Sequence, residues 1–128
     1  MQYIRRAIIV LGSMPLLAIA GDWKPRQQAI WNLASGYAFL TQCAISGHIE
    51  MQQTERLGVL YQKTLSNDAY AQWRDVYQKT LHEKRMYSIA KAEWLPYVID
   101  GESCRNGDRL AEMYATRLSS GTFSEISK

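Results

Sequence analysis

The chain has 128 residues, a length typical of one small domain. It carries 15 Lys and Arg, 12 Asp and Glu and two His, for a formal net charge of +3. Two of the basic residues lie in the first 20 positions, so the remaining 108 positions hold 13 basic against 12 acidic side chains. This near balance excludes a strongly basic nucleic-acid-binding domain and an acidic solvating tail. A polytopic membrane protein is also excluded, because no second long apolar run follows the N-terminal one.

The N-terminus has the three-part layout of a secretory signal peptide. Two arginines make residues 1–6 positive, and residues 7–17 form an apolar run. Ala18 and Ala20 then place small side chains at positions −3 and −1 of a cut before Gly21. The sequence therefore predicts cleavage between Ala20 and Gly21 by a signal peptidase.

The apolar stretch of residues 7–20 is too short to cross the hydrocarbon core of a bilayer comfortably. We therefore predict that residues 1–20 are a signal peptide and meet the membrane only transiently. Residues 21–128 are predicted to form one periplasmic or secreted domain, because no linker-like segment divides them. A buried N-terminal helix and an uncleaved membrane anchor are the alternatives.

Helix-forming residues dominate the predicted domain, and Val, Ile and Thr rarely alternate with polar residues. The first predicted helix covers residues 25–44, with Pro25 in its first turn, where proline is well tolerated. Its apolar residues recur at spacings of three and four, namely Ile30, Leu33, Ala34, Tyr37, Leu40 and Ala44. The second predicted helix covers residues 51–65, and its apolar face is marked by Leu57, Leu60, Tyr61 and Leu65.

The third predicted helix is long and covers residues 68–95. Residues 66–68, Ser-Asn-Asp, supply a turn and an N-cap before it. The apolar spacing loosens within residues 84–88, where we expect a kink, and Pro96 stops or kinks the helix at its end.

Cys43 and Cys104 are the two cysteines of the chain, and export would place them where disulfides persist. We predict that they pair, closing a loop of about 60 residues and stabilising the fold by about 4 kcal/mol. Two separate buried thiols are the alternative. A metal site is not expected, because Cys43 and His48 supply only two of the three or four ligands that zinc needs.

The last predicted helix starts near residue 103 or 106 and reaches residue 119, and the polar tail, residues 121–128, is predicted to be disordered. The predicted fold is therefore all-α: a small bundle of four or five helices behind a signal peptide. One disulfide would tie the end of the first helix to the start of the last.

Aromatic residues recur at helical spacing along the third predicted helix. Such a stripe is usually part of a core, but Trp and Tyr are also the preferred anchors of protein interfaces. The candidate partner-binding residues are therefore Tyr70, Trp73, Tyr77 and Trp94.

Basic residues also gather on this predicted helix and form a candidate basic patch, Lys79, Lys84, Arg85 and Lys91. The patch could meet phospholipid headgroups or an acidic partner. Glu83 and Glu93 dilute its charge, which favours an ordinary solvated face.

The sequence contains no recognisable catalytic or metal-binding motif. His82 and Glu83 begin like the zinc motif H-E-x-x-H, but Met86 stands where the second His is needed. His48 and Glu50 could form an acid–base pair, but no nucleophile accompanies them. We therefore predict no catalytic residue, no metal, no cofactor and no nucleic-acid partner.

These observations favour a non-enzymatic exported protein that binds a protein partner through a helical face, and they predict an exposed aromatic patch. The layout resembles, in outline, secretion pilotins, acid-stress chaperones and immunity proteins. One alternative is a small cell-wall-associated enzyme or hydrolase inhibitor, which predicts a cleft with converging polar groups. Another is a peripheral membrane-surface factor, which predicts the basic patch on one open face.

Overall fold

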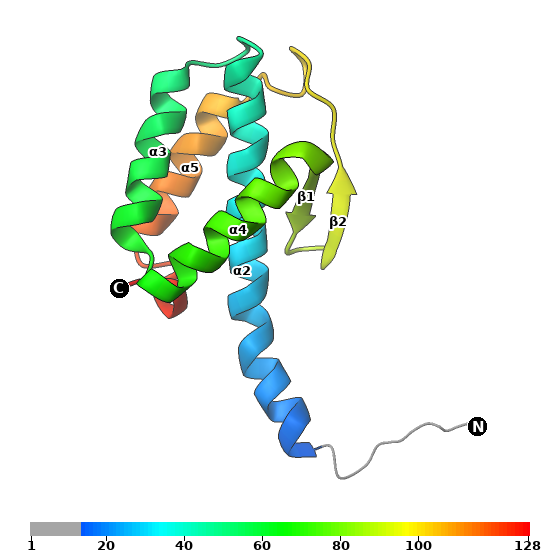
Figure 1. Ribbon diagram of the computed structural model, residues 1–128, viewed down its shortest axis with the longest axis vertical. Helices are drawn as coiled ribbons and strands as arrows, with labels where there is room; N and C mark the ends of the chain where they lie inside the picture. The colour runs from blue at the N-terminus through cyan, green and yellow to red at the C-terminus, as the bar shows by residue number, and fades with distance from the viewer. Residues whose placement is uncertain (1–13) are drawn as a thin grey trace, which may run out of the picture.

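The computed structural model describes the backbone of residues 14–128 and the side chains of residues 25–128. One long helix, α2, lies at the centre, and α4, strand β1, α3 and α5 all pack against it (Figure 1). The elements in chain order are α2 (Met14–Ile45), α3 (Met51–Thr64), α4 (Asn67–Glu83), β1 (Arg85–Ser88), β2 (Glu93–Pro96), α5 (Gly107–Ser119) and a 3-10 turn, η1 (Ser124–Ile126).

Two predicted helix boundaries are confirmed closely. The second predicted helix corresponds to α3, which ends one residue earlier than expected. Helix α4 begins at Asn67, and the Ser66 side chain caps it by accepting a hydrogen bond from the Ala69 N–H at 3.2 Å. The cap satisfies one of the backbone donors that a helix start leaves free.

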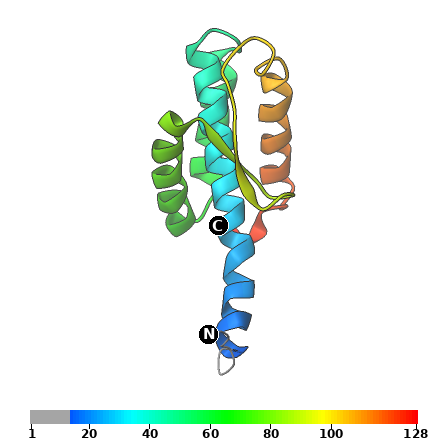
Figure 2. The ribbon, with the colours of Figure 1, turned by 90° about the vertical axis from the view of Figure 1, so that its right-hand side faces the viewer.

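Helix α2 is longer than predicted, because it begins at Met14 and passes through Pro25. Proline in a helix interior removes one backbone hydrogen bond and costs about 3 kcal/mol. The strong helix propensity of Met, Leu and Ala in residues 14–20 favours the extension. The N-terminal part of α2 projects beyond the other elements (Figures 1 and 2). The predicted cut between Ala20 and Gly21 falls within this helix, whereas residues 1–13 lie outside the described part of the chain.

The prediction of one helix over residues 68–95 is wrong. Helix α4 ends at Glu83, Lys84 adopts a left-handed conformation with φ 56°, and β1 and β2 pair as an antiparallel hairpin. Two hydrogen bonds to α2 hold the backbone of Tyr87, whose N–H donates to the Ser35 Oγ and whose carbonyl accepts from the Asn32 side chain, both at 2.9 Å. The fold is mostly helical, but it is not all-α.

The prediction that the tail is disordered is also wrong. Phe123 is 6 % exposed and Ile126 is fully buried in the core. The Ile126 carbonyl accepts from the Ser66 N–H, and the Lys128 N–H donates to the Thr64 carbonyl, each at 2.9 Å. The chain end therefore closes the lower end of the core beneath the turn between α3 and α4.

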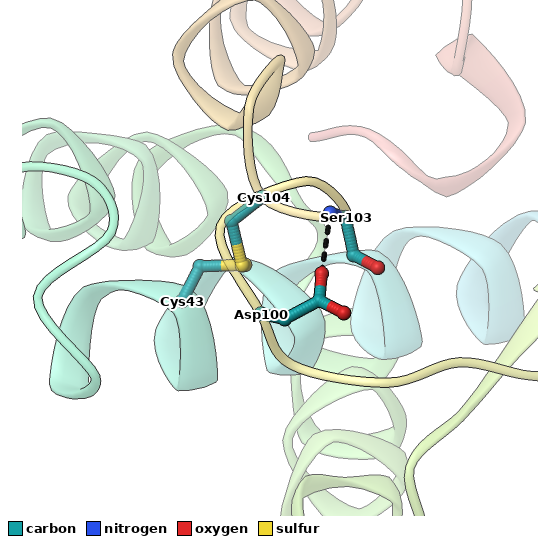
Figure 3. Close-up of a disulfide and its surroundings, with 4 residues drawn as sticks. All are labelled: Cys43, Asp100, Ser103 and Cys104. Atoms are coloured by element: carbon teal, nitrogen blue, oxygen red, sulfur yellow. Dashed lines mark hydrogen bonds between the residues drawn. A yellow bond between two sulfur atoms is a disulfide. The ribbon is translucent and has the colours of Figure 1, made fainter.

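The predicted disulfide between Cys43 and Cys104 is confirmed (Figure 3), with Cα atoms 5.8 Å apart and both residues fully buried. It joins the last turn of α2 to the segment just before α5. An Asp100 carboxylate oxygen accepts the Ser103 N–H at 2.7 Å and so fixes the turn that precedes Cys104. This backbone hydrogen bond is also the main reason why the pKa of Asp100 is lowered.

Within residues 14–128, no helix combines the length and the apolar character that crossing a membrane would require.

Candidate functional site: an aromatic groove between two helices

Helices α3 and α4 diverge from the short turn that joins them (Figure 1). They diverge because α4 packs along α2, whereas α3 packs mainly against α5. The space between them is a groove of about 470 Å³, which we call the aromatic groove. Its walls come from α2, α3 and α4, and its lining residues are Tyr37, Glu55, Gly58, Val59, Gln62, Tyr70, Trp73, Arg74, Tyr77 and Gln78.

The floor of the aromatic groove is a cluster of rings around Trp73, which is itself only 3 % exposed. Tyr70 and Tyr77 stack on either side of it, each with a ring-centroid distance of 5.5 Å. Tyr37 reaches in from α2, and its ring lies 5.4 Å from that of Trp73 and 5.1 Å from that of Tyr77. These separations suit favourable aromatic pairs.

Gly58 lets the Tyr37 ring lie under α3. A Cβ atom at this position would stand 2.4 Å from the Tyr37 hydroxyl oxygen, which is closer than atoms can approach. Burial, together with the smaller effects of Tyr77 and Glu55 nearby, raises the pKa of Tyr37 to about 12. The phenol is therefore neutral at physiological pH and offers the groove a hydroxyl group.

The rim of the aromatic groove is polar. Exposed Glu55 and Gln62 of α3 face Arg74 and Gln78 of α4, and the Arg74 guanidinium lies 5.9 Å from the centre of the Tyr70 ring. Val59, in the wall between them, is 50 % exposed. An aromatic centre within a polar rim of mixed charge is the usual composition of a protein interface.

The predicted partner-binding residues divide into two groups. Tyr70, Trp73 and Tyr77 meet in the aromatic groove, with Trp73 in the core and the two tyrosines half-buried at the surface. Trp94 was expected on the same helix, but the hairpin carries it away to a separate cluster with Trp31 and Tyr87. Its indole therefore contributes nothing to the aromatic groove.

The predicted basic patch is exposed at all four positions, but the hairpin divides it. Lys79 and Arg85 line one hollow of about 250 Å³, whose wall includes Trp94. Arg85 is already engaged, since it pairs with Glu83 at 3.1 Å and lies over the Trp94 ring. The other two residues are Lys84, at the end of α4, and Lys91, in the turn between β1 and β2.

The two histidines lie apart, His82 on the last turn of α4 and His48 in the loop after α2. The His48 ring lies beside Gly101, and its charge contributes to lowering the pKa of Asp100. Within the part of the chain that the structure describes, no three His, Cys, Asp or Glu side chains come together in a way that could hold a metal ion.

Among the lining residues of the aromatic groove that were not predicted as site residues, Tyr37 and Val59 supply the apolar surface. Tyr37 was assigned to the apolar face of the first helix, and its spacing gave no sign that the ring would reach the surface. The signal that could have indicated the position of Tyr37 is Gly58, because a glycine within a helix often marks a place where another group packs closely. Comparison of the chain with protein-family models, with curated proteins and with solved structures gives no match.

Proposed function

We propose that this chain is an exported, disulfide-bonded protein that binds a protein partner in the aromatic groove. The observation that carries the proposal is the gathering of Tyr37, Tyr70 and Tyr77 around Trp73 at the floor of an open groove. A few Trp, Tyr and Arg side chains usually supply most of the binding energy of a protein interface. This groove presents Tyr and Arg side chains within one small area, over a buried Trp.

The electrostatics of the aromatic groove favour a protein over a polyanion or a lipid surface. Its charged lining residues are Glu55 and Arg74, one acid and one base, so neither sign of charge dominates. Val59 and the outer faces of Tyr70 and Tyr77 offer apolar surface that water covers in the free protein. A partner segment with apolar side chains would bury this surface, and its polar groups would meet the rim.

Export is part of the proposal, and it rests on the layout of residues 1–20 and on the disulfide. Pro25 gives further support. In a chain that starts at Gly21, Pro25 lies near the start of the remaining helix, where the one backbone bond that it removes is the first, to the Gly21 carbonyl. The intact mass of the exported protein should therefore correspond to a chain that begins at Gly21. A mature chain that still begins at Met1 would contradict this.

Site-specific photocrosslinking tests the binding site. A photoreactive phenylalanine analogue at Val59 should crosslink a partner in the living cell, whereas the same group at Val98, which is 62 % exposed outside the groove, should not. Adding Tyr70→Ala should abolish the Val59 crosslink, because an anchor worth about 2 kcal/mol corresponds to about 30-fold in affinity. Circular dichroism must show that this variant remains folded.

Two results would contradict the proposal. One is equal crosslinking at Val59 and Val98, which would mark random encounter. The other is an undiminished Val59 crosslink in the folded Tyr70→Ala variant, which would show that the rings do not anchor the partner.

A further inference from the structure

A second groove, separate from the aromatic groove, lies between the hairpin and α5. Figure 2 looks onto the hairpin, with α5 beside it. The groove has a volume of about 450 Å³, within the usual range for small-molecule sites, and we call it the hairpin groove. Its walls are mainly apolar and include Met86, Ile89, Leu95, Leu110 and Met113.

Apolar surface is left open to water in this groove. Ile89 is 45 % exposed and Met113 is 36 % exposed, although both line a concave surface. Unbranched methionine side chains adapt to ligands of irregular shape, and the groove has one on each wall, Met86 from the hairpin and Met113 from α5.

The charge of the hairpin groove is positive. Among the described residues that line it, Arg117 is the one charged side chain, and no acidic side chain lines it. The positive charge of Arg117 acts on the neighbouring Tyr114 phenol and lowers its pKa against the larger, raising effect of burial. An occupant that complements this groove therefore carries a negative charge as well as apolar surface.

We propose that the hairpin groove binds a fatty acid, with its carboxylate at Arg117 and its aliphatic chain along the hairpin. A carboxylate matches the Arg117 guanidinium in charge and geometry. An aliphatic chain suits the walls better than a peptide does, because each peptide unit brings an N–H and a C=O that need partners. Pro96 has no N–H to donate, so it hinders the pairing of a peptide strand with the outer edge of β2.

Titration of the purified mature protein with decanoate tests this proposal, read by backbone amide shifts in NMR. We expect saturable shifts confined to the hairpin and α5, including Ile89 and Met113. Decyltrimethylammonium, which has the same chain with a positive head, should bind at least about tenfold more weakly. Similar affinities for the two amphiphiles would overturn the role of charge, and a lack of saturable binding of decanoate would overturn the site.

Two variants on α5 distinguish recognition of the ligand's charge from nonspecific hydrophobic binding. Arg117→Gln should weaken decanoate binding about tenfold or more, whereas Arg109→Gln, at an exposed position outside the groove, should leave it unchanged. Equal affinities in the two variants would refute the assignment of the carboxylate.

A peptide with apolar residues and a free C-terminal carboxylate that displaces decanoate at lower concentrations would overturn the choice of a lipid.

Discussion

Replacing Ser35 by Ala should weaken the attachment of the hairpin to α2. Ser35 is fully buried, and its hydroxyl oxygen has two roles. It donates to the Trp31 carbonyl at 2.7 Å, as serine often does within a helix, and it accepts the N–H of Tyr87 at 2.9 Å. The first bond is dispensable, because the carbonyl retains its helical partner. The second bond is not, since Tyr87 is 4 % exposed and its N–H faces away from β2.

The expected cost follows from the orphaned donor. A buried backbone N–H that loses its partner costs about 1–3 kcal/mol. Taking about 2 kcal/mol, the melting temperature of a domain of this size should fall by about 10 °C. Protection of the Tyr87 amide against hydrogen exchange should fall by about 30-fold if the hairpin opens on its own.

Thr80→Val is the matched control. Thr80 is 1 % exposed, and its hydroxyl donates only to helical carbonyls, Val76 at 2.8 Å and Tyr77 at 3.4 Å. Its removal therefore orphans no donor, and the valine side chain fills nearly the same volume. Thermal and urea denaturation of both variants should show a much larger loss for Ser35→Ala. Equal losses, with Tyr87 exchange unchanged, would refute the role assigned to Ser35.

Three further perturbations test the fold. Cys104→Ser should lower the free energy of unfolding by about 4 kcal/mol in calorimetry or urea denaturation, because a cross-link with a sequence separation of 61 is lost; the reduced wild-type chain should match it, and a stable reduced chain would contradict the estimate. Truncation after Ser120 should lower the free energy of unfolding by about 3–5 kcal/mol in urea denaturation, since it removes the buried side chains of Phe123 and Ile126. An unchanged midpoint would instead support the prediction that the tail is disordered. Burial raises the pKa of Tyr114 from 10.0 to about 12, so its contribution to stability is complete below pH 10 and is lost as the pH rises through about 12. The NMR signals of the Tyr114 ring should therefore show ionisation only together with the loss of helical circular dichroism, and ionisation of Tyr114 near pH 10 in the folded chain would contradict the burial.

The features that the sequence predicted well depend on local signals or on simple counting. The bounds of α3 follow from helical periodicity, and the start of α4 follows from the cap at Ser66. The disulfide followed from there being only two cysteines. The position of Tyr70, Trp73 and Tyr77 on one helix face followed from their spacing, and the stacking of the rings is a finding of the structure.

The hairpin could not be predicted, because its cause is not local. Residues 84–93 are rich in Lys, Ala, Glu and Met, which favour a helix. Lys84 and Ala92 adopt positive φ values of 56° and 55°, where Gly or Asn would have signalled a turn. The bonds that anchor the strand reach Ser35, 52 positions earlier in the chain, and no sequence window contains both partners. The divided basic patch and the displaced Trp94 both follow from this one missed element.

The order of the tail and the full lining of the aromatic groove were not predicted, for a related reason. Phe123 and Ile126 are two apolar residues in a polar segment, too few to predict an element, but they suffice to close a core that already exists. Tyr37 belongs to the buried face of α2 by its spacing, and it reaches the groove only because α3 and α4 diverge above it. Both outcomes depend on where other elements lie.

The composition of the core connects the fold to the compartment that we propose for it. Leu, Ile, Val and Phe make up only 20 of the 108 residues from Gly21 onward, so rings occupy positions that aliphatic side chains often fill. Rings bury large areas but bring polar atoms with them. The Tyr61 hydroxyl and the Trp73 indole N–H are both buried without a partner among the described residues, and each unpaired group costs about 1–3 kcal/mol. A cross-link worth about 4 kcal/mol offsets costs of this size. A core of this kind therefore depends on its disulfide more than an aliphatic core would, and it depends through that bond on an oxidising compartment.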